Sequence, residues 1–132
     1  MAPGRLEELN EDRSLNGNRV KIAMAALLGA AIWIASPFIT GRREPWDAPG
    51  PYYALTLFGA GALMGLWEPQ RPWRWVVAIY AGQCLAVLAL TALRGDDLGL
   101  FFPMGMVVLA FFTVLSLLGA AGGAWLRRSR SG

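Results

Sequence analysis

Residues 98–126 read LGLFFPMGMVVLAFFTVLSLLGAAGGAWL, a run of 29 residues without a charged side chain. An α-helix rises about 1.5 Å per residue, and roughly 20 apolar residues cross the hydrocarbon core of a bilayer. Pro103 lies near the start of the run, where a helix tolerates the missing N–H. The run therefore predicts a transmembrane helix that is long enough to tilt or to project beyond the bilayer.

Three more uncharged runs precede this one, at about residues 22–40, 52–67 and 75–93. Only 16% of the 132 residues are charged, against about 25% in a typical soluble domain. A water-soluble helical bundle of this size would need charged faces on its helices. The sequence therefore predicts one all-α domain over residues 20–127, an integral membrane bundle of four transmembrane helices with up-down topology.

The two ends of the chain differ from this body in composition. Residues 1–19 are polar and turn-prone, with acidic and basic side chains nearly in balance. They predict a flexible cytoplasmic tail with one or two helical turns. Residues 128–132 predict a short basic tail, also cytoplasmic.

The distribution of basic residues predicts the orientation. Nine of the 12 Lys and Arg residues lie in the N-terminal segment, in the connection 68–74 and at the C-terminus, and the other connections carry three. Because loops rich in Lys and Arg stay on the cytoplasmic side, both termini are predicted to be cytoplasmic. The arginine-rich flanks and the lack of a eukaryotic targeting signal favour a bacterial inner membrane.

Small residues recur at a spacing of four in two of the apolar runs. Gly61 and Gly65 form one pair, and Gly119 and Gly123 form another. This spacing places small residues on one helix face and lets two backbones approach closely. The stripes predict packing inside the bundle, or a contact through which the protein forms an oligomer.

Three polar side chains fall near the middle of apolar runs: Gln83, Thr113 and Ser116. An amide in hydrocarbon needs a hydrogen-bonding partner, so Gln83 is predicted to face another helix. The alternative is that these three residues, together with Thr40, line a path for an ion or small solute.

Charged and aromatic residues gather in the two predicted outer connections. One connection carries Arg42, Arg43, Glu44, Trp46 and Asp47, and the other carries Arg94, Asp96 and Asp97. These residues form a candidate partner-docking surface or pore mouth. The alternative is simple solvation and contact with lipid headgroups.

Composition argues against catalysis and against several kinds of binding. The chain has no histidine and a single cysteine, Cys84, so the commonest general base and an internal disulfide are both lacking. We therefore predict no enzyme activity, no metal site and no cofactor. An enzyme would require the carboxylates of Glu44, Asp47, Asp96 and Asp97 to converge. Basic residues cluster at the ends of apolar runs rather than along one face, which argues against nucleic-acid binding.

Two functions remain. The sequence favours an accessory or structural subunit that packs in the lipid bilayer against a protein partner, or against itself, through small-residue helix faces. The alternative is a small homo-oligomeric channel or facilitator. The absence of ionisable residues at helix centres argues against proton-coupled transport.

Overall fold

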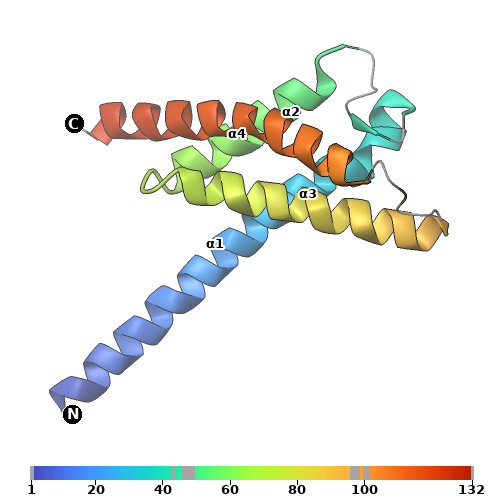
Figure 1. Ribbon diagram of the computed structural model, residues 1–132. Coiled ribbons are helices and arrows are strands. Elements are labelled where there is room, and N and C mark those ends of the chain that lie inside the picture. The colour runs from blue at the N-terminus through green and yellow to red at the C-terminus, as the bar shows by residue number, and fades with distance from the viewer. Residues whose placement is uncertain (1, 43, 46–49, 96–98, 100–101, 132) are drawn as a thin grey trace.

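The computed structural model describes residues 2–42, 44–45, 50–95, 99 and 102–131. Over these residues the chain forms four helices and no strands. The helices are α1 (Pro3–Thr40), α2 (Tyr52–Trp67), α3 (Trp73–Arg94) and α4 (Phe102–Ser131). Successive helices run in opposite directions, and both termini lie at the same end of the molecule (Figure 1). The all-helical prediction is therefore confirmed.

Three of the helices, α1, α3 and α4, are long and apolar enough to cross a membrane. The fourth, α2, has 16 residues and is shorter. Large apolar side chains lie on the outside of the molecule, for example Phe38, Leu93 and Phe111, which are 86%, 84% and 77% exposed. Lipid tails cover such side chains without cost. The chain is thus a multi-pass membrane protein.

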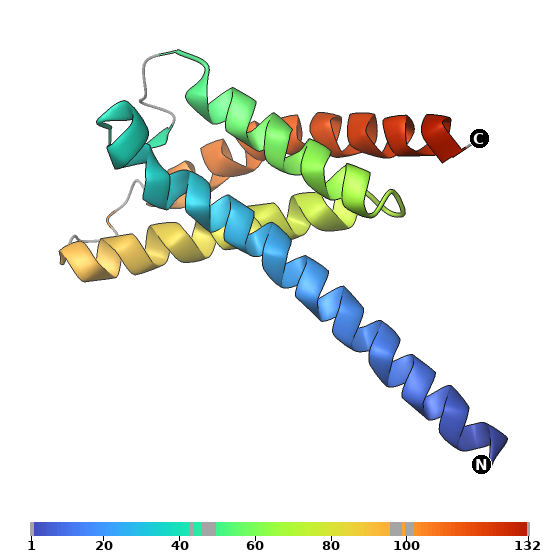
Figure 2. The same ribbon diagram turned by 180° about the vertical axis from the view of Figure 1, so that it is seen from behind.

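Helix α1 extends much further than the sequence predicted. It begins at Pro3, whereas the sequence predicted a polar tail over residues 1–19 and a helix from residue 22. Pro3 occupies the first helical position, which suits its fixed backbone angle. Starting a helix is costly, and the membrane-spanning part of α1 already meets that cost. Each further residue toward the N-terminus therefore adds one hydrogen bond without a new nucleation step. Figure 2 shows this half of α1 projecting alone beyond the bundle.

The other helix bounds differ less from the predicted runs. Helix α2 matches the predicted 52–67, and α3 is longer than the predicted 75–93 by a few residues. Helix α4 is described from Phe102, with Pro103 in its first turn, and it runs through the predicted basic tail to Ser131. Its predicted start at residue 98 lies outside the described residues. Arg128 and Arg130 lie in its last turn, where positive charge favours the helix dipole.

The four helices form two closely packed pairs, α2 with α4 and α1 with α3, and glycines allow the backbones in each pair to approach closely. A Cβ atom placed on any of six glycines would overlap a backbone carbonyl oxygen of the paired helix. The overlaps are Gly61 with Ser116, Gly65 with Ala120, Gly119 with Phe58, Gly123 with Ala62, Gly29 with Ile79, and Gly82 with Ala26. The structure thus places the four glycines singled out in the sequence at a contact within the chain.

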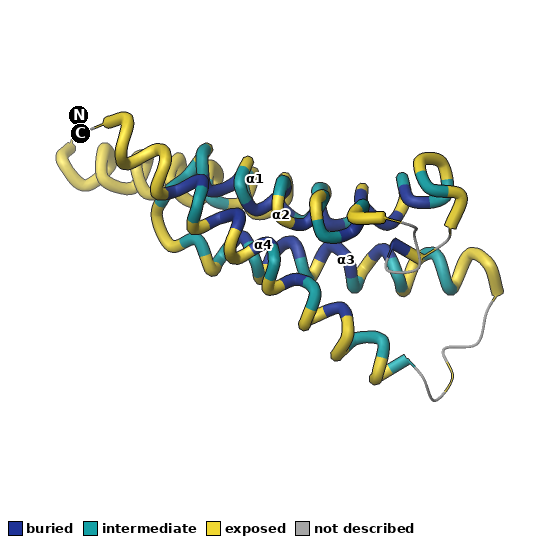
Figure 3. The backbone as a smooth tube through the Cα atoms, turned by 90° about the horizontal axis from the view of Figure 1, so that it is seen from above, coloured by how far each residue is buried: buried dark blue, intermediate teal, exposed yellow. Residues whose placement is uncertain are grey.

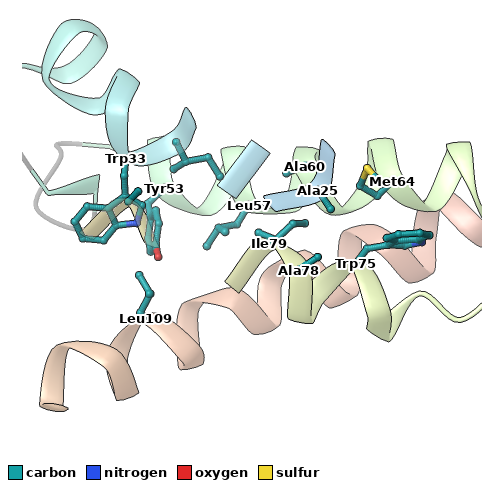
Figure 4. Packing of buried hydrophobic residues seen from close by; sticks show 12 residues of the cluster. Ala25, Trp33, Tyr53, Leu57, Ala60, Met64, Trp75, Ala78, Ile79 and Leu109 are labelled. Carbon is teal, nitrogen blue, oxygen red and sulfur yellow. The ribbon is translucent and has the colours of Figure 1, made fainter. Parts of the chain in front are cut away.

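The core lies along the line where the two pairs meet, and residues toward the termini are exposed (Figure 3). Figure 4 shows Trp33, Tyr53 and Leu109 at one end of this core and Met64 and Trp75 at the other. The end of the bundle near Trp75 also carries both termini and the turn between α2 and α3. We call it the termini end.

Candidate functional site

Polar side chains from all four helices meet around Gln83 in the core. Gln83 comes from α3 and is fully buried, and Thr113 comes from α4 and is 2% exposed. Trp33 of α1 and Tyr53 of α2 are each 4% exposed. We call these four residues the Gln83 cluster.

Hydrogen bonds connect the whole Gln83 cluster. The indole Nε1 of Trp33 and the hydroxyl of Tyr53 donate to Oε1 of Gln83, at 3.3 and 2.6 Å. Nε2 of Gln83 donates to Oγ1 of Thr113 at 3.0 Å, and this hydroxyl donates to the carbonyl oxygen of Leu109 at 2.7 Å. One amide therefore joins its own helix to the other three.

The arrangement satisfies a strict energetic requirement. A buried amide or hydroxyl costs several kcal/mol in an apolar medium unless it finds a partner. In the part of the chain that the structure describes, every buried side-chain nitrogen and oxygen has one. The sequence predicted a hydrogen-bonding partner for Gln83 on another helix, and the structure shows three, one on each of the other helices. Tyr53 also packs against Phe112, with 5.0 Å between the two ring centroids.

The other hydroxyls proposed to line a solute path bond within their own helices. Ser116 is fully buried, and its hydroxyl donates to the carbonyl oxygen of Thr113 at 2.6 Å. The hydroxyl of Thr40 donates to the carbonyl oxygen of Ser36 at 2.8 Å. Each hydroxyl thus gives its proton to the protein backbone.

Only part of the predicted outer loop cluster can be placed. Arg42, Glu44 and Arg94 are exposed. The remaining members, Arg43, Trp46, Asp47, Asp96 and Asp97, lie outside the described residues. The docking function of these loops therefore stays a prediction.

A second polar cluster, which the sequence did not indicate, surrounds the turn between α2 and α3 at the termini end. Nζ of Lys21 in α1 forms an ion pair with Oε2 of Glu68 at 2.7 Å. The indole of Trp75 donates to the carbonyl oxygen of Glu68 at 3.0 Å. From α4, Arg127 and Arg128 donate to the carbonyl oxygens of Leu66 and Pro69, at 2.7 and 3.0 Å. The sequence used these basic residues only to predict orientation, and in the structure they also connect the turn to α1 and α4.

The Lys21–Glu68 pair predicts a small acid-dependent loss of stability. The hydrogen bond from Lys21 is the main reason that the pKa of Glu68 lies below its ordinary value of 4.5. Because the folded protein lowers this pKa, the contribution is full above pH 4.5 and is lost as the pH falls through the folded value. Both side chains are partly exposed, so the pair contributes at most about 1 kcal/mol.

We expect Glu68→Gln to remove this part of the pH dependence and to lower stability near pH 7 by less than about 1 kcal/mol. Unfolding measured in detergent micelles from pH 3 to pH 7 checks it. Glu11→Gln, which removes an exposed carboxylate from the projecting half of α1, is the matched control and should keep the acid-dependent loss that the Lys21–Glu68 pair causes. A Glu68→Gln profile that is identical to wild type would refute the assignment.

Comparison of the chain with protein-family models, with curated proteins and with solved structures finds no match.

Proposed function

We propose that this chain is an accessory or structural subunit of a bacterial inner membrane, which packs against another membrane protein. The observation that supports the proposal is the Gln83 cluster. Its amide oxygen accepts two hydrogen bonds from within the bundle, and its amide nitrogen donates to a third helix. The polar groups that could have bound a solute therefore form hydrogen bonds within the bundle itself. Contacts with other molecules would then involve the outer surface.

The proposal includes four membrane crossings with cytoplasmic termini. At 16 residues, α2 is about 24 Å long, and its glycines pack along α4, which is a candidate span. A short span is accommodated by local thinning of the bilayer and by interfacial anchors at its ends. Lys21, Arg74, Arg127 and Arg128 all lie toward the termini end, and an excess of Lys and Arg favours the cytoplasmic side.

The projecting half of α1 is the part of the outer surface best suited to a partner's soluble region. Residues 3–17 are all exposed, including Leu6, Leu9 and Leu15 at 50%, 51% and 48%. An isolated helix of this length is marginal in water, and Gly4 and Gly17 weaken it further. A partner that packs along this segment would supply the missing stabilisation.

Site-specific photo-crosslinking in cells tests the proposal. A photoreactive residue is placed at Leu9 on the projecting helix or at Leu85, which is 64% exposed on α3, with buried Ala25 as the control position. The complexes are then purified in mild detergent and identified by mass spectrometry. We expect one defined membrane protein at Leu9 or Leu85 and nothing at Ala25.

Recovery of the chain alone from both exposed positions would refute the proposal. Crosslinks only between copies of this chain, together with solute flux above that of empty vesicles after reconstitution, would favour the channel alternative instead.

A further inference from the structure

Two neighbouring arginines of α4, Arg127 and Arg128, contact the turn between α2 and α3. Arg127 donates from Nη1 to the carbonyl oxygen of Leu66 at 2.7 Å, and Arg128 donates from Nη2 to that of Pro69 at 3.0 Å. The carbonyl of Leu66 belongs to the last turn of α2, where carbonyl groups lack a partner within the helix. Because the two acceptors are only three residues apart, both guanidinium groups are held at one small region of the surface.

Positive charge exceeds negative charge at this region. Glu68 lies in the turn between the two acceptors, and its carboxylate forms an ion pair with Lys21 at 2.7 Å. Among the described residues, no carboxylate forms an ion pair with Arg127 or Arg128. Three cationic groups therefore share one carboxylate, which leaves two positive charges without a counter-charge.

Both guanidinium groups keep hydrogen-bond donors for a further ligand. A guanidinium group carries five N–H donors, and the contacts with the turn use one nitrogen of each arginine. Both residues are exposed, so the remaining donors are open to the surroundings. The carbonyl oxygens position the two groups but carry only partial negative charge. The pair is thus arranged in advance for an anion, which lowers the entropy cost of binding one.

Exposed tryptophans place this pair near the level of lipid headgroups. Trp125 is 66% exposed, and Arg127 and Arg128 follow it by two and three residues, about 3–4.5 Å along the helix. Trp67, 44% exposed, is the last residue of α2 and directly precedes the turn. Tryptophan favours the boundary between hydrocarbon and water. The two arginines therefore lie where the phosphate groups of a bilayer are found.

We propose that Arg127 and Arg128 together bind the phosphate of one anionic phospholipid at the termini end. Guanidinium and phosphate form strong, often bidentate, charge-assisted hydrogen bonds. A zwitterionic headgroup brings a positive charge of its own, which the unbalanced charge of the site repels. Free phosphate offers the same chemistry, but the neighbouring tryptophans favour a phosphate that the membrane carries.

Native mass spectrometry of the full chain in mild detergent tests this site. The protein is incubated with phosphatidylglycerol or with phosphatidylcholine of the same acyl chains. We expect wild type to retain one phosphatidylglycerol about tenfold more strongly than phosphatidylcholine, a typical effect for a charged hydrogen-bonding contact. The double variant Arg127→Gln/Arg128→Gln should lose this preference.

The double variant Arg19→Gln/Arg130→Gln is the matched control. It removes the same number of exposed positive charges, and within the described part of the chain neither side chain hydrogen-bonds to the turn. We expect it to keep the preference of wild type. Equal loss of the preference in both double variants would mean that net charge alone attracts the lipid, and would overturn the proposal.

A lysine pair covers the case in which the glutamine pair does not fold. Arg127→Lys/Arg128→Lys keeps both charges but lacks the planar fork, so we expect a weaker preference than in wild type. Equal retention of the two lipids by wild type, or an undiminished preference in the glutamine or lysine pair, would contradict the site. Displacement of the lipid by millimolar inorganic phosphate would show that free phosphate is the ligand, against the proposal. The test needs no partner protein, so its outcome is independent of the proposed function.

Discussion

Replacing Gln83 with leucine is expected to destabilise the folded bundle by about 2–3 kcal/mol. Leucine fills a similar volume but gives no acceptor to the indole of Trp33 or the hydroxyl of Tyr53, both of which stay buried. Hydrogen bonds between membrane helices contribute about 0.6–2 kcal/mol each. Gln83→Leu removes three such bonds, and at about 0.6–1 kcal/mol each, the lower end of these values, the expected loss is about 2–3 kcal/mol.

Equilibrium unfolding in mixed micelles with increasing denaturing detergent measures this loss. Thr56→Val is a suitable control, because among the described residues its hydroxyl bonds only to carbonyl oxygens of its own helix, those of Tyr52 and Tyr53. We expect the control to change the free energy of unfolding by less than about 0.5 kcal/mol. A Gln83→Leu variant as stable as this control would show that the cluster does not hold the helices together.

The second large effect is expected at the contact between α2 and α4. A valine at position 119 would press its Cβ into the carbonyl oxygen of Phe58, so Gly119→Val must separate the two helices. Overpacking of this kind typically costs about 1–3 kcal/mol, and a clash with backbone relaxes less easily than one with a flexible side chain. We therefore expect a loss of about 3 kcal/mol in the same unfolding assay.

Gly122→Val provides the matched control on the same helix. A Cβ at Gly122 meets nothing within 4 Å, and the position lies three residues from Gly119. The control changes stability by helix propensity alone, with an expected gain of a few tenths of a kcal/mol. If both variants lose stability equally, the close approach of α2 and α4 at Gly119 is wrong.

The sequence predicted the helices well wherever hydrophobicity alone sets their limits. The runs 52–67 and 75–93 correspond closely to α2 and α3, because charged or proline-containing connections end them. It failed for residues 3–21, where composition is polar and the helix depends on continuation from an apolar segment that is already helical. Composition reports what a segment can bury, and it says little about how far an existing helix continues.

The candidate site was also predictable from the sequence only in part. The need of Gln83 for a partner follows from its position in an apolar run, and so the sequence alone predicted a contact with another helix. The identity of the partners depends on how each helix is rotated about its axis, which one sequence does not reveal. Tyr53 illustrates this, because an aromatic hydroxyl next to a loop suits an interface as well as a core.

A double-mutant cycle between Gln83 and Tyr53 tests the central claim most directly, namely that the interior polar groups serve the bundle itself. The free energy of unfolding is measured for wild type, Gln83→Leu, Tyr53→Phe and the double variant. If the two side chains bond to each other, the double variant loses less than the sum of the single losses, by about 1 kcal/mol. If the single losses add to the loss of the double variant within about 0.5 kcal/mol, the two residues act independently. That result would contradict the claim that the interior polar groups serve the bundle itself, on which the proposed function rests.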